Sequence, residues 1–281
     1  MQKIALITDS SSDLSKEIMD KLNIKSAPFR IIYSDNEYED RVTISPQEVY
    51  SNLTKEIPTT SLPNISRIEG ILKNIEAEGY THVIVINISS GLSGTSNSFR
   101  LILDDHPNLV SYVFDSKTLS MAQGAIVLEV AKLIESGTSY EDIILALPNL
   151  RKNIHVYFTL NTLEYLKKGG RIGKVAGTIG EILNLKPLIY VSDEGVYVTH
   201  SKSRGRKQAL SKLNEVLDGY LAKSKCNLWI IEGDAKEESN LLFNLLKDNP
   251  QINKVEITTL GPALGVHTGP GLLGFIIQEV Q

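Results

Sequence analysis

Hydrophobic and polar positions along the chain follow two periods, one typical of strands and the other of helices. Residues 82–88 form a short apolar run rich in β-branched side chains, which predicts a buried strand. Residues 96–103 have the spacing of a helix, and residues 89–95 between them read Ser-Ser-Gly-Leu-Ser-Gly-Thr. This order places serine hydroxyls and free backbone N–H groups at the positive end of a helix, where anions bind.

The same alternation runs through the first half of the chain and predicts βαβ units with a mostly parallel sheet. Strands are expected at 3–8 and 110–114, and helices at 13–22, 65–78 and 119–135, with a capping box at 45–48 starting another helix near Pro46. The carboxyl ends of parallel strands share one edge of a sheet. We therefore expect the polar segments 8–12, 89–95 and 115–116 to converge there.

The second half has a different pattern, typical of an α+β unit. A turn signal at 192–195 joins strands expected at 186–191 and 196–200 in a hairpin. The elements expected around it are a helix at 179–185, a helix at 206–221, a strand at 227–232, a helix opened by Asp234 with Glu237 as its capping-box partner, a strand at 254–259 and a final apolar element after a Gly/Pro loop. The predicted fold class is therefore α/β, with an N-terminal parallel-sheet domain over 1–153 and a C-terminal α+β domain over 154–281.

Composition is that of a globular protein, because 42% of the 281 residues are hydrophobic and 22% are charged. The net charge of -4 argues against a general nucleic-acid binder, which needs an excess of Lys and Arg on one face. The single cysteine, Cys226, excludes an internal disulfide. We expect a reducing, cytoplasmic location.

Two apolar segments are not expected to enter a membrane. The N-terminal run ends at Asp9 and is too short for the core of a signal peptide. Residues 257–278 carry no charged residue apart from His267, but Pro262, Pro270 and five glycines interrupt them.

Motif searches exclude several kinds of chemistry. The chain has no G-x-x-x-x-G-K-[ST] loop for a nucleoside triphosphate, and its histidines lack the spacing of metal ligands. His267 lies in the Gly/Pro-rich segment 261–271, which predicts a titratable ring at the tip of a shaped loop. The alternative is a hydrogen-bonded loop histidine without a functional role.

A serine hydrolase is the main alternative from the residues alone. Residues 91–95 nearly fit the G-x-S-x-G nucleophile elbow, and Ser93, Asp115 and His267 follow one another in the order of a triad. Thr95 replaces the final glycine of that elbow. A regulatory module that senses small anions is a third possibility.

Six segments resemble motifs of the DegV family, and their order and spacing cover the whole chain. They are Asp9-Ser10-Ser11, Thr59-Thr60-Ser61-Leu62-Pro63, Ser90-Gly91-Leu92-Ser93-Gly94-Thr95, Phe114-Asp115-Ser116, Gly170-Arg171-Ile172 and the Gly-Pro-x-x-Gly-x-His segment at 261–267. The resemblance to these bacterial fatty-acid-binding proteins implies two α/β domains with an acyl chain held between them.

The resemblance also implies individual ligand-binding residues. Thr60 and Ser93 match positions that hydrogen-bond the fatty-acid carboxylate, with Ser61 and Gly94 beside them, and Arg171 and His267 match positions near the same head group. Leu62 stands where the family often has glutamine, so no polar contact is expected from it. Glycine at position 94 allows the backbone to approach a ligand, so Gly94→Leu is expected to weaken binding by steric exclusion.

The function implied by the resemblance is that of a carrier and not an enzyme. Members of the family are the fatty-acid-binding subunits of fatty acid kinase, which present the carboxylate to an ATP-dependent kinase subunit, and the resulting acyl phosphate feeds phospholipid synthesis. The bound fatty acid is then the only ligand, with no cofactor, no metal and no catalytic residue. An acyltransferase and a transient membrane surface are further partners to consider.

Basic residues gather in two places in this acidic chain, at 167–174 and at 202–207. We expect Arg204, Arg206 and Lys207 to dock a partner such as the kinase subunit. The alternative is an ordinary solvated surface.

Overall fold

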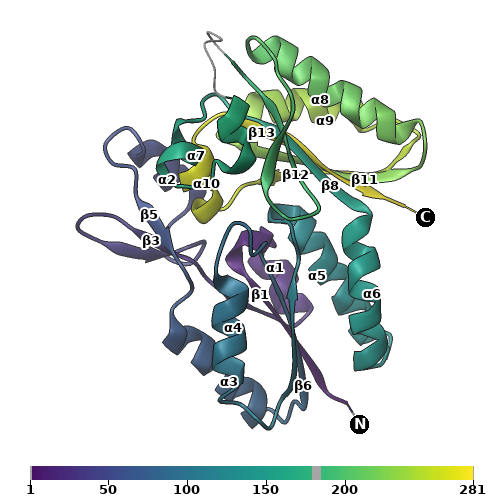
Figure 1. The fold of residues 1–281 in the computed structure, drawn as a ribbon. Helices are drawn as coiled ribbons and strands as arrows, with labels where there is room; N and C mark the ends of the chain where they lie inside the picture. The colour runs from purple at the N-terminus through teal and green to yellow at the C-terminus, as the bar shows by residue number, and fades with distance from the viewer. Residues whose placement is uncertain (1, 179–184, 281) are drawn as a thin grey trace.

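The computed structural model describes residues 2–178 and 185–280, and its first half is built on a four-stranded parallel sheet (Figure 1). The strand order is β2–β1–β6–β7. The strands are β1 (Ile4–Asp9), β2 (Ile24–Ala27), β6 (His82–Asn87) and β7 (Val110–Asp115). A short 3₁₀ turn (Ser10–Ser12) and helix α1 (Lys16–Lys21) connect β1 to β2.

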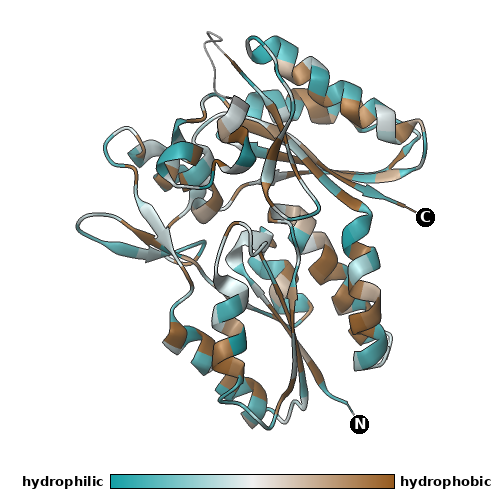
Figure 2. Cartoon of the chain, viewed as in Figure 1, coloured by the Kyte–Doolittle hydropathy of each residue, from teal (hydrophilic) through white to brown (hydrophobic). Residues whose placement is uncertain are grey.

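Helices cover both faces of this sheet because alternate residues of each strand point to opposite sides. Ala5, Ile7 and Val85 pack in one cluster with α3 (Ile65–Ala77) and α4 (Thr95–Leu103). On the opposite face, residues such as Leu6, Ile84 and Ile86 pack with α5 (Ser120–Glu135) and α6 (Tyr140–Lys152). Hydrophobic residues accordingly line the strands and the helix faces turned toward them (Figure 2).

The second half is built on a six-stranded mixed sheet with the order β10–β9–β8–β13–β11–β12. Its strands are β8 (Ile154–Thr159), β9 (Leu188–Val191), β10 (Tyr197–Ser201), β11 (Cys226–Gly233), β12 (Ile252–Thr259) and β13 (Leu272–Glu279). Neighbouring strands are antiparallel except β11 and β12, which are parallel. Helices α8 (Arg206–Leu221) and α9 (Lys236–Leu246) cover one face.

Helix α5 joins the two halves. Its residues belong to one continuous hydrophobic cluster that also contains Leu6 of the parallel sheet and Val156 and Ile276 of the mixed sheet. Residues 120–127 of this helix are all buried. A helix buried on every side is typical of a core element. The largest cluster of the described residues therefore lies between the two sheets.

A small three-stranded antiparallel sheet lies beside the junction of the halves (Figure 1). It has the order β4–β3–β5, with β3 (Arg30–Ile32), β4 (Glu37–Glu39) and β5 (Thr59–Ser61). Helix α2 (Pro46–Asn52) and the late helix α10 (Pro262–Thr268) share a hydrophobic cluster with it through Ile31, Val49 and Val266. Helix α7 (Glu164–Lys168) packs on α10, and a second 3₁₀ segment (Gly173–Thr178) lies against β10. The small sheet thus brings residues from both ends of the chain together.

The predicted fold class is confirmed, and several elements match the sequence pattern closely. Helix α8 has the expected bounds, α2 begins at Pro46 with the expected capping box, and β9 pairs with β10 as a hairpin. The division at residue 153 stays a prediction, although α6 ends just before it and β8 begins just after it. Of the helix expected at 179–185, residues 179–184 lie outside the described residues.

Three local expectations are wrong. The helix expected from residue 13 begins at Lys16, because Asp13 has a left-handed backbone and Ser15 is the N-cap. Asp234 does not open the next helix, since it has a φ of 55° and α9 has Ala235 as its N-cap without a side-chain hydrogen bond. The segment 261–271 is not a plain loop, because α10 occupies most of it.

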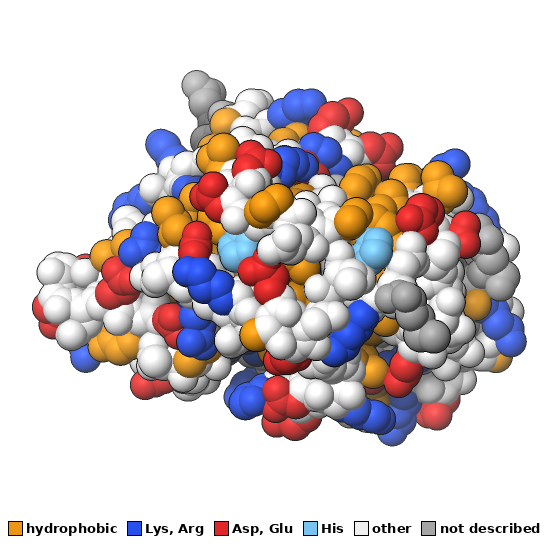
Figure 3. All heavy atoms as spheres, turned by 90° about the horizontal axis from the view of Figure 1, so that it is seen from below, with side chains coloured by type: hydrophobic (Ala, Val, Ile, Leu, Met, Phe, Trp, Pro, Cys, Tyr) orange, Lys and Arg blue, Asp and Glu red, His pale blue; other side chains and the backbone are white. Residues whose placement is uncertain are grey.

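Within residues 2–178 and 185–280, no helix is both long enough and hydrophobic enough to cross a membrane. On the face seen from below in Figure 3, acidic and basic side chains are interspersed. That face therefore offers no continuous basic surface of the kind that binds nucleic-acid phosphates.

The close pairing of β13 with β8 generates a test of the fold. A Cβ atom at Gly274 would lie 2.6 Å from the Phe158 Cβ atom, with no flexible side chain to move aside. We expect Gly274→Ala to lower the free energy of unfolding by about 1–3 kcal/mol. Gly70→Ala is the matched control, because this exposed position in α3 has no atom within 4 Å of an added Cβ atom. It is expected to stabilise the protein by about 0.5–1 kcal/mol in urea unfolding. Equal effects at both positions would contradict this account.

Candidate functional site

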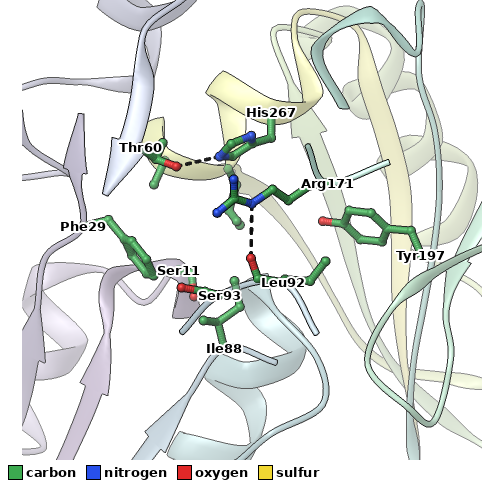
Figure 4. A pocket seen from close by; sticks show the side chains of 11 residues that line it. Ser11, Phe29, Thr60, Ile88, Leu92, Ser93, Arg171, Tyr197 and His267 are labelled. Atoms are coloured by element: carbon green, nitrogen blue, oxygen red, sulfur yellow. Dashed lines mark hydrogen bonds between the residues drawn. The ribbon is translucent and has the colours of Figure 1, made fainter. Parts of the chain in front are cut away.

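A small pocket of about 40 Å³ lies where the two halves and the small sheet meet (Figure 4). It is lined by Ser11, Phe29, Thr60, Ile88, Leu92, Ser93, Arg171, Tyr197, Ala263, Leu264 and His267. The three polar segments converge at this edge of the sheet as predicted, and those after β1 and β6 line the pocket. The lining combines a few polar groups with a mostly apolar wall, which is typical of small-molecule sites.

Asp9 holds in place the two segments that reach the pocket from the carboxyl ends of β1 and β6. Its carboxylate accepts hydrogen bonds from the backbone N–H of Ser11 (3.1 Å) and Ile88 (2.9 Å) and from Nδ2 of Asn87 (3.1 Å). Burial raises the pKa of Asp9, and hydrogen bonds from the Ser11 hydroxyl, the Ile88 N–H and the Gln123 and Asn87 side chains partly offset that rise. The carboxylate holds the segments after both strands in place.

Residues 89–91 are held by contacts with both halves of the chain. Ser89 Oγ donates to the Gly195 carbonyl in the β9–β10 turn (2.7 Å), and the Ser90 N–H donates to Asp115 (3.0 Å). Burial raises the pKa of Asp115, but hydrogen bonds from Lys117 and Ser90 outweigh it and lower the pKa below its ordinary value. Asp115 therefore supports this segment and does not line the pocket.

Helix α4 begins at Thr95, with Gly94 as its N-cap, two residues after Ser93. Within the described part of the chain, the backbone N–H groups of Gly94, Thr95 and Ser96 have no hydrogen-bond acceptor. Ser93 Oγ lies 2.8 Å from Thr95 Oγ1. The start of α4 thus combines hydroxyls, free N–H groups and the positive end of the helix dipole, as the sequence predicts.

Thr60 and His267 meet although they are far apart in the sequence. Thr60 lies on β5 and its Oγ1 is 2.7 Å from Nε2 of His267, which lies in the last turn of α10. The ring Nδ1 atom is buried and has no hydrogen-bond partner among the described residues. Burial, with a smaller effect of the Arg171 charge, lowers the pKa of His267 to about 4. The imidazole is therefore neutral near pH 7 and offers a hydrogen bond without a charge.

Arg171 supplies the positive charge of the pocket and connects the two halves. Its Nη1 donates to the Gly169 carbonyl (2.7 Å) and its Nε donates to the Leu92 carbonyl in the other half (3.2 Å). Its Nη2 has no acceptor in the part of the chain that the structure describes. Arg171 can therefore pair with an anion in the pocket while it holds the segment before α4.

The structure brings four of the predicted ligand-binding residues to the pocket, namely Thr60, Ser93, Arg171 and His267. Ser61 does not line it, because alternate residues of β5 face opposite sides and Ser61 Oγ accepts from Arg30 Nη2 (2.8 Å). Gly94 is the N-cap of α4 and is exposed. A Cβ atom there would meet only the Leu62 side chain, at 3.9 Å, so protein atoms leave space beside it.

The residues that sequence reasoning missed are mostly apolar members of the lining, such as Phe29, Tyr197 and Leu264. Tyr197 lies on β10 and presents its hydroxyl toward the pocket (Figure 4). The alternation of β10 identifies one buried face of that strand, but only the packing of both halves shows that this face meets a pocket.

The contacts of the site do not assemble a hydrolase triad. His267 pairs with Thr60, Ser93 pairs with Thr95, and Asp115 accepts from Ser90 and Lys117. Neither of the hydrogen bonds that define a Ser-His-Asp relay occurs between these residues. Among the described residues there is also no group of three or more His, Cys, Asp or Glu side chains with the geometry of a metal site.

Comparisons with known proteins give matches over nearly the whole chain. A family model described as "Uncharacterised protein, DegV family" matches residues 3–280. A DegV domain-containing protein of Clostridium acetobutylicum is 50% identical over 277 residues, which are 99% of each chain. A DegV domain-containing protein of Clostridium perfringens is 47% identical over 279 residues, again 99% of each chain.

Solved structures show the same fold. The crystal structure of DegV, a fatty-acid-binding protein from Bacillus subtilis, matches with a TM-score of 0.91 and 30% identity, covering 100% of both chains. A fatty-acid-binding DegV family protein from Thermus thermophilus matches with a TM-score of 0.90 and 29% identity, covering 99% of this chain and 100% of the other. A stearic-acid-binding protein from Eubacterium ventriosum matches with a TM-score of 0.88 and 28% identity, covering 99% and 98%.

The lowered pKa of His267 predicts a pH dependence of stability. Below its ordinary pKa of 6.5 the unfolded ring binds a proton that the folded ring excludes until about pH 4, so stability is lost as the pH falls between these values. Between pH 7 and pH 5 the wild type is expected to lose about 2 kcal/mol more than His267→Gln in urea unfolding. Groups common to both proteins cancel in this difference. The same pH profile in both would show that the ring titrates normally.

Proposed function

The chain belongs to the DegV family, and we propose that it binds a long-chain fatty acid with the carboxylate in this pocket and the acyl chain in the hydrophobic interior. The observation that supports this most directly is the convergence of Thr60, Ser93, Arg171 and His267 on one pocket between the halves, whose remaining lining is mostly apolar. Structures of relatives described as binding fatty acids support this proposal.

The polar groups of the pocket suit a carboxylate. A carboxylate removed from water without partners costs several kcal/mol, so it requires donors or a cation. The Ser93 hydroxyl, the N–H groups at the start of α4 and the Thr60 hydroxyl are such donors, with Thr60 oriented by the Nε2–H of the neutral His267 ring. Arg171 supplies one positive charge, which balances the single negative charge of the carboxylate.

The hydrophobic cluster around α5 suits the acyl chain. Phe29, Ile88 and Leu264 line the pocket and also belong to the cluster between the two sheets. Burial of about ten methylenes at roughly 0.8 kcal/mol each supplies about 8 kcal/mol before the costs of ordering. A pocket of about 40 Å³ accommodates the head group alone, so side chains of this cluster must separate to admit the tail. Affinity then comes mainly from the tail, and orientation comes from the head group.

We infer that the chain acts as a carrier in the cytoplasm and presents the carboxylate to a separate ATP-dependent kinase. A carboxylate oxygen of the fatty acid attacks the γ-phosphorus of ATP, a new P–O bond forms, and the bond to the bridging oxygen of ADP breaks. The acyl phosphate then passes to an acyltransferase of phospholipid synthesis, with transient contact to a membrane surface. No cofactor is required besides the bound lipid.

Arg204 and Lys207 are the proposed docking residues for the kinase subunit. Both side chains are exposed at the start of α8. Arg206 differs, because its side chain forms two hydrogen bonds with Glu238 of α9, at 3.0 and 2.7 Å, and its charge is thereby neutralised. We therefore assign docking to the first two residues and a structural role to Arg206.

Head-group variants test fatty-acid binding. Thr60→Val and Ser93→Ala each remove one hydroxyl donor from the pocket. Each is expected to weaken binding of hexadecanoate about tenfold in calorimetric titration, since a hydrogen bond to a charged group contributes about 1.5 kcal/mol or more. Thr54→Val, at an exposed threonine away from the pocket, is the control. A wild-type protein that yields no fatty acid by mass spectrometry and binds none would refute the function, and so would labelling of Ser93 by a fluorophosphonate.

Charge reversal tests the docking surface. Arg204→Glu combined with Lys207→Glu is expected to weaken binding of the kinase subunit about tenfold and to slow acyl phosphate formation, while fatty-acid retention stays unchanged. Lys223→Glu, just beyond the far end of α8, is the matched control. Loss of fatty acid from the double variant, or an equal effect of the control, would count against docking at this place.

A further inference from the structure

A second and larger cavity lies next to the head-group pocket. Its volume is about 360 Å³, and it is lined by Ile57, Pro58, Thr59, Thr60, Lys168, Gly169, Arg171, Val266 and His267. Thr60, Arg171 and His267 line both spaces, so these three side chains form the boundary between them. We call the second space the outer cavity.

The outer cavity has the charge of an anion site. Lys168 and Arg171 contribute two positive charges to its lining, and none of the described residues that line it is acidic. Lys168 pairs with Glu164 one turn earlier in α7 at 2.6 Å, but both side chains are more than half exposed. A pair so open to water is weak, so Lys168 can turn from Glu164 to a ligand at little cost.

We propose that the outer cavity is the subsite for the phosphoryl group of an acyl phosphate, with Lys168 as the cation that distinguishes this product from the free fatty acid. The proposal rests on the proposed function, which includes both fatty-acid binding and conversion of the bound acid to an acyl phosphate. It assigns a role to a residue outside the head-group pocket and to a space that the fatty acid itself does not need.

The volumes of the two spaces support placing the carboxyl group in the head-group pocket and the phosphoryl group in the outer cavity. A single buried water requires about 10–15 Å³, so about 40 Å³ suits a carboxyl group and leaves no room for an added phosphoryl group. When the acyl carbonyl keeps its place beside Thr60 and His267, the next group of the ligand projects past them. The outer cavity lies there, and its volume is about nine times that of the head-group pocket.

The charges of the two ligands also support the proposed phosphoryl subsite. A phosphoryl group carries about 1.5–2 negative charges at neutral pH, compared with one on the carboxylate. The His267 ring stays neutral at that pH and adds no charge. Arg171 alone balances the fatty acid, and Lys168 supplies the additional positive charge that the product requires.

Paired titrations with two ligands of equal chain length test the proposal. The ligands are hexadecanoate and a β-ketophosphonate in which a methylene replaces the bridging oxygen of the corresponding acyl phosphate. Lys168→Met is expected to weaken phosphonate binding about five- to tenfold and to leave hexadecanoate binding within a factor of two. Lys168→Arg keeps the charge and is expected to restore most of the phosphonate affinity.

Two further variants are matched controls. Lys167→Met removes the neighbouring exposed charge of α7, which does not line the outer cavity, and is expected to change neither affinity. Glu164→Gln releases Lys168 from its partner and is expected to maintain or strengthen phosphonate binding.

The results separate failure of this inference from failure of the proposed function. If the wild type binds neither ligand, the proposed function itself is wrong. If the wild type binds both ligands and Lys168→Met weakens both equally or neither, the fatty-acid function stands and the phosphoryl subsite is overturned. Equal effects of Lys167→Met and Lys168→Met on phosphonate binding also overturn it, because they indicate only the general charge of the surface.

Discussion

The buried carboxylate of Asp9 is the interaction on which the site depends. It lies at the carboxyl end of β1, and its oxygens accept from the backbone after β1 and from Asn87 and Ile88 at the end of β6. A carboxylate at this depth is stable only with such donors, so neither segment can shift without leaving acceptors unpaired. These hydrogen bonds tie the start of the irregular segment 88–95 to the end of β1, so the parallel sheet determines where this segment begins. The position of Ser93 and of the free N–H groups of α4 follows from that constraint and not from the loop itself.

The head-group pocket belongs to neither half of the chain alone. His267 reaches Thr60 across the junction, Arg171 donates to the Leu92 carbonyl, and Ser89 donates to the Gly195 carbonyl. These contacts are polar and few, whereas the adjoining cluster around α5 is large and apolar. The junction therefore combines a nonspecific hydrophobic attraction with a small number of directional contacts that fix the register of the halves. Such an arrangement suits a ligand that is itself mostly hydrocarbon with one polar end.

Local sequence patterns predicted the elements that satisfy their own hydrogen bonds and bury one face. Helix α8 and the β9–β10 hairpin are examples, because periodicity and turn residues specify each of them within a short stretch. The start of α4 was predictable for the same reason. Segments whose conformation depends on distant residues were not predictable: β3 and β5 are three-residue strands, and α10 is a short helix held by packing on α2 and the small sheet. The same limit applies to the pocket. Family resemblance identifies Thr60, but the roles of Phe29 and Tyr197 depend on how the two halves pack together, which local sequence patterns do not specify.

The sequence separation of Thr60 and His267 has a consequence for the time at which the site forms during synthesis. The two residues are 207 positions apart. At about 5–20 residues per second, a ribosome needs roughly 10–40 s to proceed from the first to the second. During this interval the N-terminal sheet can fold, but α10 has not yet been made and the wall of the pocket is incomplete. A nascent chain thus completes the wall of this pocket only after α10 has left the exit tunnel, so products that terminate before residue 267 lack the imidazole that faces Thr60.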